Sequence, residues 1–243
     1  MNFSQIVKKL QMTRPVFHSE DDLKLAMAMI INKLYPTYQI RLERPTEVNM
    51  QTRNGIATAR APIDFVVLDP IEKRAYPIEI KYTTKKAILR SDDETFSLTN
   101  HGANDIRRYS FRKDIYRVEN VKIENYTIKQ GFVFILTNDK GYYQNDVSSK
   151  NSLAANFSFH HGVVLSKDYT GWNLVKIPED KYDLDLQETV DANKKRHWTL
   201  GKQYVYQLGL KSDYLIQWCD YSTFALDKGI IENFKYCLIE VEG

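Results

Sequence analysis

The sequence predicts an α/β fold in which a mixed β-sheet is flanked by helices. A pattern at helical spacing near the N-terminus precedes two β-rich runs joined by a short turn, and a second helical segment leads into a near-continuous apolar run. A run that is apolar throughout is typical of a strand buried on both faces. The resulting order of helix, strand, hairpin, helix and buried strand indicates a sheet covered by helices.

The first predicted elements lie upstream of the β-rich runs. Residues 19–34 are predicted to form a helix, because Ser19 is a favoured N-cap, acidic residues fill the first turn and apolar residues recur at helical spacing up to Pro36. A short strand is predicted over 37–43. The polar stretch 44–61 is predicted to be a loop or a ragged hairpin.

The central elements carry the strongest pattern. The runs PIDFVVLD at 62–69 and AYPIEIKY at 75–82 are predicted strands, separated by a segment that contains the turn-forming pair Asp-Pro. Residues 97–120 begin with turn-forming residues and continue as a helix. The apolar run at 131–138 is the predicted buried strand.

The C-terminal part is harder to interpret. Residues 139–201 are loop-rich, with one short strand predicted at 171–177. Further strands are predicted over 203–210, 214–219 and 234–241. The fold class therefore includes additional C-terminal β strands.

Length and composition favour one domain in the cytoplasm. A chain of 243 residues suits a single α/β domain with elaborations. Neither a signal peptide nor a membrane span is indicated, so no membrane partner is expected. Cys219 and Cys237 are predicted to be buried free thiols. The chain lacks a glycine-rich phosphate loop, a nucleophile elbow and a metalloprotease helix motif, which excludes those enzyme classes.

Three charged residues in the central hairpin indicate a chemical site. Side chains alternate along a strand, so Ile63 and Phe65 are expected on one face and Asp64 on the other, with Glu79 and Lys81 projecting together. A hairpin centred on the turn places Asp64 opposite Glu79. Carboxylates this close repel each other unless a cation lies between them, and oxygen ligands suit Mg²⁺, for which Mn²⁺ can substitute. Lys81 can orient or deprotonate a water and offset charge on a phosphate.

A fourth acidic residue is expected near this patch. Glu20 begins the helical stripe that faces the core, so its carboxylate is predicted to lie over the sheet near the metal. The helix dipole alone also explains an acidic residue in the first turn. The two interpretations remain open at this point.

These residues resemble a known nuclease motif. Pro62-Ile63-Asp64, a 14-residue gap and then Glu79-Ile80-Lys81 resemble the PD-(D/E)XK motif, and Glu20 resembles the supplementary acidic residue of that superfamily. The predicted element order is similar to the superfamily's restriction-endonuclease-like core, αβββαβ, over residues 16–138. The resemblance implies a single nuclease domain spanning 1–243, with 139–243 as a loop-rich elaboration.

The resemblance also implies roles for individual residues. Asp64, Glu79 and the Ile80 carbonyl would bind Mg²⁺, Glu20 would complete one metal site or a second, and Lys81 would serve the attacking water. The DNA backbone would be held by residues of the second helix and by the basic cluster after the motif, namely Asn104, Arg107, Arg108, Lys113 and Lys85. The expected function is a metal-dependent DNA endonuclease, hydrolysing phosphodiester bonds in restriction or genome defence.

Other functions fit the same pattern. A structure-specific or repair nuclease of the resolvase kind would use the same residues. A non-catalytic nucleic-acid-binding module would keep the fold, and a structural protein could bury an Asp-Glu-Lys cluster without binding metal. A homodimer is compatible with double-strand cleavage, which usually needs two sites related by symmetry.

Overall fold

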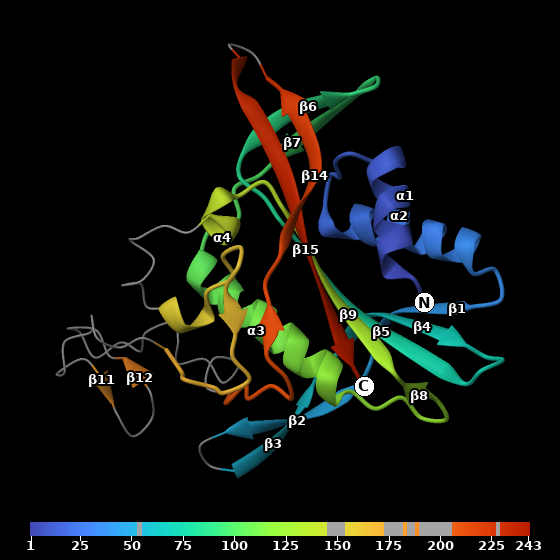
Figure 1. Ribbon diagram of the computed structural model, residues 1–243, viewed down its shortest axis with the longest axis vertical. Helices are drawn as coiled ribbons and strands as arrows, with labels where there is room; N and C mark the ends of the chain where they lie inside the picture. The colour runs from blue at the N-terminus through green and yellow to red at the C-terminus, as the bar shows by residue number, and fades with distance from the viewer. Residues whose placement is uncertain (53–54, 145–153, 173–181, 184–187, 190–205, 227–228) are drawn as a thin grey trace.

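The computed structural model describes residues 1–52, 55–144, 154–172, 182–183, 188–189, 206–226 and 229–243. Its centre is a seven-stranded mixed sheet (Figure 1). The strands follow the order β1-β4-β5-β9-β15-β14, and β8 also pairs with β5. Their bounds are β1 Gln39–Arg44, β4 Ile63–Asp69, β5 Arg74–Thr83, β8 Thr127–Ile128, β9 Gln130–Thr137, β14 Trp218–Ala225 and β15 Ile231–Glu242.

The sheet is mixed because β5 runs parallel to its neighbours β9 and β8, whereas the other neighbouring pairs are antiparallel. The helix α3 (Asn104–Asn120) connects the β5 side of the chain to β9. A parallel pair needs a crossover of this kind. The predicted α/β class, a mixed sheet flanked by helices, is confirmed at this level.

Two helices cover one face of the sheet. They are α1 (Phe3–Thr13) and α2 (Glu20–Leu34), which pack with alternate residues of the strands, Phe65, Ile78 and Phe132 among them. The opposite face packs against α3 and contributes the neighbouring positions, such as Val133. Alternation along β5 therefore sends Ile78 and Ile80 toward α1 and α2, and sends Glu79 and Lys81 toward α3.

The predicted helix at 19–34 is confirmed as α2. The Ser19 side chain accepts a hydrogen bond from the Asp22 N–H over 3.1 Å, and the helix ends before Pro36. Helix α1 was missed by the sequence interpretation. Its signal was the spacing of the buried residues Phe3, Ile6, Val7 and Leu10 behind an Asn2 N-cap.

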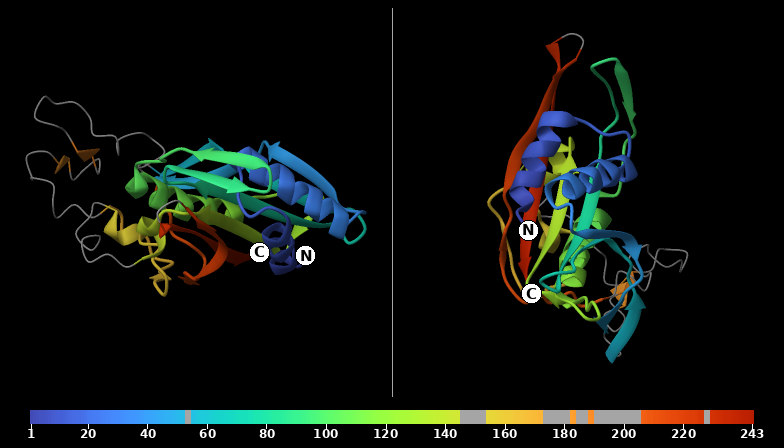
Figure 2. Two further views of the ribbon diagram at one scale, coloured as in Figure 1. Left: turned by 90° about the horizontal axis from the view of Figure 1, so that it is seen from above. Right: turned by 90° about the vertical axis from the view of Figure 1, so that its right-hand side faces the viewer.

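Two hairpins extend beyond the sheet. Residues 44–61 form the hairpin β2 (Glu47–Thr52) and β3 (Gly55–Arg60), and a second hairpin comprises β6 (Ala87–Ser91) and β7 (Glu94–Leu98). Figures 1 and 2 show β6 and β7 beside the β14–β15 pair at one end of the molecule and β2 and β3 at the other. The helix predicted to follow the turn-forming residues of 97–120 is α3, which begins at Asn104 and ends at Asn120, and β7 takes residues 97 and 98 of that stretch.

The C-terminal strands join the central sheet. β15 lies antiparallel to β9, and β14 continues to Ala225, beyond the predicted end at residue 219. Residues 206–210 are not a strand, because Leu208 and Leu210 bond to other partners: the Leu208 carbonyl accepts from Arg112, and the Leu210 N–H donates to the Lys167 carbonyl. The rest of that predicted strand, 203–205, and residues 173–177 lie outside the described residues, and 171–172 are not in a strand.

Several short elements complete the described chain. They are α4 (Lys140–Tyr143), a 3-10 helix (Ala155–Phe157), the pair β10 (Val164–Leu165) and β13 (Tyr214–Leu215), and the pair β11 (Tyr182–Asp183) and β12 (Glu188–Thr189). Across the described ranges, every helix falls short of the length and apolarity that crossing a membrane requires.

Two details differ from the sequence interpretation. Cys237 is a buried free thiol as predicted, but Cys219 is exposed, because β14 is the last strand of the sheet and its residues are covered less completely. Ile63 packs with Val66 and Leu68 instead of sharing the face of Phe65.

Candidate active site

The candidate site lies where β4 and β5 part. Their ladder reaches the pair Phe65 and Ile78, in the register that places Asp64 across from Glu79. Beyond this pair the backbone ladder between β4 and β5 ends. There the Ile80 N–H donates instead to the side chain of Asp64, whose Oδ2 accepts over 2.8 Å. The predicted hairpin register is therefore confirmed, and the side chain of Asp64 is held by the backbone of the neighbouring strand.

Glu20 occupies the next position along the same strand edge. Its Oε2 accepts a hydrogen bond from the Tyr82 N–H over 2.9 Å. Backbone N–H groups two residues apart on a strand point to the same side. The N–H groups of Ile80 and Tyr82 face the side of β5 where β4 has ended. The carboxylates of Asp64 and Glu20 accept the hydrogen bonds that a continuing β4 strand would otherwise accept. The structure places Glu20 beside the sheet, as its position at the start of the core-facing stripe predicts.

Glu79 lies on the face of the sheet that α3 covers. It has 0% of its surface exposed, and Arg117 of α3 forms an ion pair with it over 2.8 Å. Neither carboxylate oxygen of Glu79 accepts a hydrogen bond. Asp114, one helical turn before Arg117, forms an ion pair with that arginine over 3.3 Å, and its Oδ2 accepts no hydrogen bond.

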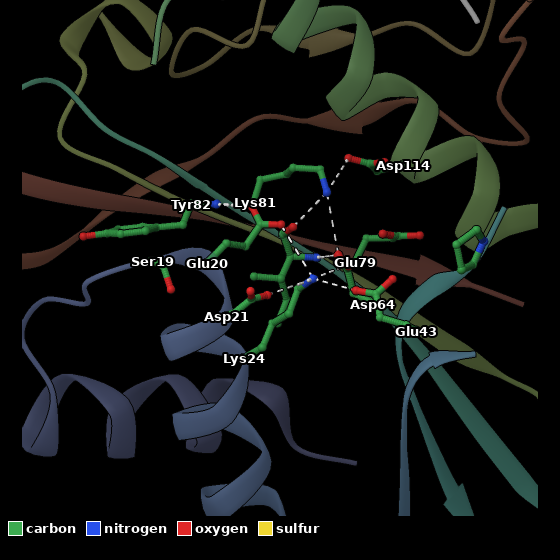
Figure 3. Close-up of polar contacts among 12 residues, drawn as sticks. Ser19, Glu20, Asp21, Lys24, Glu43, Asp64, Glu79, Lys81, Tyr82 and Asp114 are labelled. Carbon is green, nitrogen blue, oxygen red and sulfur yellow. Dashed lines mark hydrogen bonds and ion pairs between the residues drawn. The ribbon is translucent and has the colours of Figure 1, made fainter. Parts of the chain in front are cut away.

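The Lys81 ammonium lies among oxygen atoms of both strands and of α3. Its Nζ donates to the Ile80 carbonyl over 2.9 Å and lies 3.6 Å from both Asp64 and Asp114 (Figure 3). Asp64, Glu79 and Lys81 therefore lie close together, and Asp114 and Arg117 of α3 form ion pairs with Lys81 and Glu79 respectively. The Ile80 carbonyl, expected to bind a metal, here accepts from Lys81.

A second ammonium enters the site from α2. Lys24 Nζ lies 2.8 Å from Asp64 Oδ1, 2.8 Å from Glu43 Oε1 and 3.7 Å from Glu20 Oε1. Figure 3 shows Lys24 reaching from the helix toward these carboxylates. Glu43 belongs to β1, so three elements supply acidic groups around one lysine.

The surroundings lower the pKa of the Asp64 carboxyl group and raise that of the Glu79 carboxyl group. Burial raises the pKa of Asp64, but the charge of Lys81 and the hydrogen bond from Lys24 outweigh it and bring the pKa to about 2. Burial raises the pKa of Glu79 well above its usual range, and repulsion from Asp114 adds to this more than Arg117 offsets. Asp64 is therefore ionised at neutral pH, whereas Glu79 resists ionisation.

Lys81 stays protonated in this environment. Burial lowers its pKa, but Asp114 and Asp64 outweigh the burial and hold the pKa above the usual range for lysine. The side chain therefore offers a fixed positive charge at neutral pH. This favours stabilising negative charge over accepting a proton from water.

The donor chemistry of the site suits a hard cation. Carboxylate oxygens and a backbone carbonyl are the ligands that Mg²⁺ prefers. Glu79 Oε2 and Asp114 Oδ2 are buried without hydrogen-bond donors, whereas Glu79 Oε1 is paired with Arg117 over 2.8 Å. Among the described residues, however, no three His, Cys, Asp or Glu side chains are grouped closely enough to hold a metal ion. The magnesium ion therefore stays a prediction.

A cavity of about 320 Å³ opens onto the site. Its charged lining includes Asp64, Glu79 and Lys81 together with Lys113 and Arg117 of α3. Its other side consists mainly of residues of the β2–β3 hairpin and the segment that follows, namely Met50, Ala59, Arg60, Ala61 and Pro62. The lining thus combines acidic and basic groups of the sheet and α3 with mainly apolar residues of the hairpin.

The predicted DNA-contacting residues occupy different places. Lys113 lines the cavity. Near the other end of α3, Asn104 bonds to Asp139 and accepts from Tyr142, and the exposed Lys85 lies 3.7 Å from Asp139. Residues 104 and 114 are ten positions apart, about 15 Å along a helix. The structure therefore does not gather these side chains at the cavity.

The two arginines at the start of α3 differ from each other. Arg107 is half-buried, and its Nε donates to the Gly102 carbonyl. Arg108 is buried and donates to the Gly141 carbonyl over 2.6 Å. The guanidinium of Arg108 thus joins α3 to α4 inside the protein and offers no surface for a phosphate backbone.

Four charged residues were not predicted as members of the site: Lys24, Glu43, Asp114 and Arg117. Lys24 lies four residues after Glu20, a spacing that puts both on one face of a helix. Asp114 and Arg117 show the corresponding spacing of three on α3. These spacings were available in the sequence, but only the packing of the helices on the sheet shows which charged faces point inward.

Comparison of this chain with protein-family models, with curated proteins and with solved structures finds no match. Its function is therefore argued from its own residues.

Proposed function

We propose that the protein is a metal-dependent nuclease of the PD-(D/E)XK type that hydrolyses phosphodiester bonds in DNA. The observation that carries the proposal is the convergence of Asp64, Glu79 and Lys81 where β4 and β5 part. Two buried carboxylates and a fixed ammonium beside a cavity are the groups that metal-assisted phosphodiester hydrolysis requires.

The arrangement of the elements supports the finer fold assignment. The order α2, β1, β4, β5, α3 and β9 is similar to the αβββαβ core of restriction-endonuclease-like proteins, with the two helices on opposite faces of the sheet. The hairpins β2–β3 and β6–β7 are insertions into that order, and β14 and β15 extend the sheet beyond it.

Each residue has a role in the proposed reaction. Asp64, Glu79 and the Ile80 carbonyl would hold the metal, with Glu20 beside them. The metal, when bound, supplies Lewis acidity and a water of lowered pKa. Lys81 stabilises the negative charge that develops on the phosphate, because its raised pKa keeps it protonated. Lys113 and Arg117, which line the cavity, would supply positive charge to the phosphate.

DNA as the substrate, and a role in restriction or genome defence, are proposed from the motif resemblance. Burial raises the pKa of Glu79, and a divalent ion bound there would favour its ionised form.

One observation favours a second candidate, a structural cluster without metal. Lys24, Lys81 and Arg117 already neutralise part of the acidic charge of the site. A protein of this kind would bind no divalent ion and cleave no nucleic acid, yet it would lose stability when these ion pairs are removed.

The deciding experiment is cleavage of supercoiled plasmid, linear duplex and branched DNA with Mg²⁺ or Mn²⁺, with and without chelator. The variants are Asp64→Asn, Glu79→Gln and Lys81→Met, and Asp93→Asn on the exposed tip of the β6–β7 hairpin is the matched control. Cleavage by the wild type and the control alone, lost in chelator, supports the proposal.

Three other outcomes would overturn the proposal. Cleavage that persists in chelator or in all three site variants rules out the mechanism. Tight DNA binding without cleavage of any substrate indicates a binding module. Absence of both cleavage and Mn²⁺ uptake indicates the structural cluster.

A further inference from the structure

The β2–β3 hairpin forms one side of the cavity beside the site. Met50 of β2 and Ala59 of β3 line the cavity. Figure 1 shows the hairpin beside α3, and the Tyr116 hydroxyl of that helix donates a hydrogen bond to the Asn49 carbonyl of β2 over 2.8 Å. Because the hairpin is bonded to the helix, this side of the cavity is held in place before any ligand binds.

Tyr206 lines the cavity from a distant part of the chain. Its carbonyl accepts a hydrogen bond from the Tyr109 hydroxyl of α3 over 3.1 Å, and the next N–H, that of Gln207, donates to the Gln51 carbonyl of β2 over 2.7 Å. The half-buried ring packs against the hydrophobic cluster that contains Met50. Among the described residues that line the cavity, Tyr206 is the one aromatic residue. Its backbone contacts therefore fix an aromatic ring at the cavity.

The charge of the lining suits an anion. Basic residues outnumber acidic ones there by four to three. One of the acidic residues, Glu79, resists ionisation, because burial and the charge of Asp114 raise its pKa. The lining therefore carries an excess of positive charge at neutral pH. The basic residues are Arg60, Lys81, Lys113 and Arg117, and the acidic ones are Glu43, Asp64 and Glu79.

The proposed catalytic groups lie below the surface of the protein. Glu79 is 0% exposed and Asp64 7%, and the Lys81 side chain is 21% exposed. The cavity above them measures about 320 Å³, at the small end of the range for ligand pockets, ~300–1,000 Å³. This space suits one nucleotide and not a double helix, which is a stiff rod with its bases stacked inside. A nucleotide must leave the base stack to enter such a pocket.

We propose that the cavity binds one unpaired nucleotide of a DNA strand, with its base stacked on the ring of Tyr206. Its phosphate lies toward Lys81, Lys113 and Arg117. This inference rests on the proposed function and narrows its substrate to single strands, frayed ends and looped-out bases. Tyr206 is then a substrate-binding residue, and stacking on its ring accepts any base, because every base has a π face.

The first test compares two DNA probes with the wild-type protein. Fluorescence anisotropy measures the affinity of the full-length protein for a labelled oligothymidylate and for a labelled blunt duplex of the same length, both in chelator so that cleavage does not interfere. The oligothymidylate should bind more tightly by roughly 5- to 100-fold, the range that one base–aromatic stack provides.

Substitutions of Tyr206 test its role directly. Tyr206→Ala should weaken binding of the oligothymidylate by roughly 5- to 100-fold, whereas Tyr206→Phe should preserve binding because the ring remains. Tyr126→Ala, at a half-buried tyrosine outside this cavity, is the matched control and should bind as the wild type does. Duplex binding should be the same in all of these variants.

A second pair of variants tests the cavity if Tyr206→Ala does not fold. Ala59→Leu places a larger side chain in the cavity and should weaken binding of the oligothymidylate. Ala57→Leu, at an exposed position two residues earlier on the same strand, is the matched control and should leave binding unchanged. Thermal unfolding midpoints show that each variant is folded at the temperature of the binding measurement.

The outcomes separate this inference from the proposed function. Equal affinity of the wild type for both probes, or tighter binding of the duplex, overturns the unpaired nucleotide, while metal-dependent cleavage of plasmid keeps the nuclease. Equal losses in Tyr206→Ala and Tyr126→Ala, or in Ala59→Leu and Ala57→Leu, overturn the placement of the nucleotide in this cavity. Absence of binding to either probe, together with absence of cleavage, overturns both proposals.

Discussion

The Asp64 carboxylate accepts a hydrogen bond from the Ile80 backbone N–H, 2.8 Å away, at the point where the β4–β5 ladder ends. A strand N–H that loses its partner carbonyl must find another acceptor or remain unpaired. The side chain of Asp64 meets this need and is held in one orientation as a result. The backbone thus positions the carboxylate on which the proposed chemistry depends.

This contact makes a prediction for two substitutions of Asp64. Asp64→Asn keeps an acceptor for the Ile80 N–H but loses the charge, so the fold should persist while cleavage falls by roughly 10²–10³-fold. Asp64→Ala also leaves the N–H unpaired and should lower the free energy of unfolding by a further ~1–3 kcal/mol. Initial cleavage rates and denaturant unfolding measure the two effects. Equal stability of the two variants would contradict the role of the hydrogen bond.

Glu79 should make the metal-free protein less stable as pH rises. Burial first, and Asp114 next, raise its pKa, so the folded state holds this proton more tightly than the unfolded chain. Stability is therefore lost from the ordinary value of 4.5 upward through the folded pKa. In chelator, Glu79→Gln should gain about 1–3 kcal/mol at neutral pH and nothing below the ordinary pKa. Denaturant unfolding at both pH values is the measurement, and an equal gain at both would contradict the assignment.

Metal binding should release a proton from Glu79. A carboxyl group must lose its proton to bind a divalent ion, and burial, with repulsion from Asp114, raises the pKa of Glu79 well above its usual range. The apparent affinity for Mn²⁺ should therefore increase with pH. Titration calorimetry in two buffers of different ionisation enthalpy counts the released proton. A binding enthalpy that does not depend on the buffer would contradict this prediction.

Asp114 should set the pH range of activity. Its charge raises the pKa of Lys81 and that of Glu79, in each case as the largest contribution after burial. Asp114→Asn should therefore move the acid limb of the pH–rate profile, which follows Glu79, to lower pH. A role in folding alone would reduce the rate at every pH without moving that limb. The matched control is Asp105→Asn, on the first turn of the same helix.

Lys113 and Arg107 should contribute unequally to DNA binding. Lys113 lines the cavity with Lys81 and Arg117, whereas Arg107 lies near the other end of α3. Lys113→Ala should weaken binding more and reduce the slope of log affinity against log salt by about one unit. Fluorescence anisotropy with labelled duplex over a range of salt measures this slope. A larger loss in Arg107→Ala would move the DNA path to the N-terminal end of α3.

The sequence predicted those parts of the molecule that depend on neighbours along the chain. Ser19 and the acidic turn after it predict the start of α2, because a cap acts within one helical turn. The register of the hairpin follows from the short turn between its strands, so the pairing of Asp64 with Glu79 was predictable. In contrast, the β6–β7 hairpin was not predicted, and its last strand takes the first two residues of the stretch assigned to the turn before α3.

The sequence by itself determined the α/β class, the hairpin and the patch of Asp64, Glu79 and Lys81, because periodicity and turn chemistry are local. Only the tertiary structure decided what surrounds that patch: the ammonium of Lys24 on one side and the Asp114–Arg117 pair on the other. It also decided that β15 extends the central sheet. Ion pairs between helices and strands depend on how distant segments pack, and the spacing of charges along one helix does not record which partners on other elements they will meet.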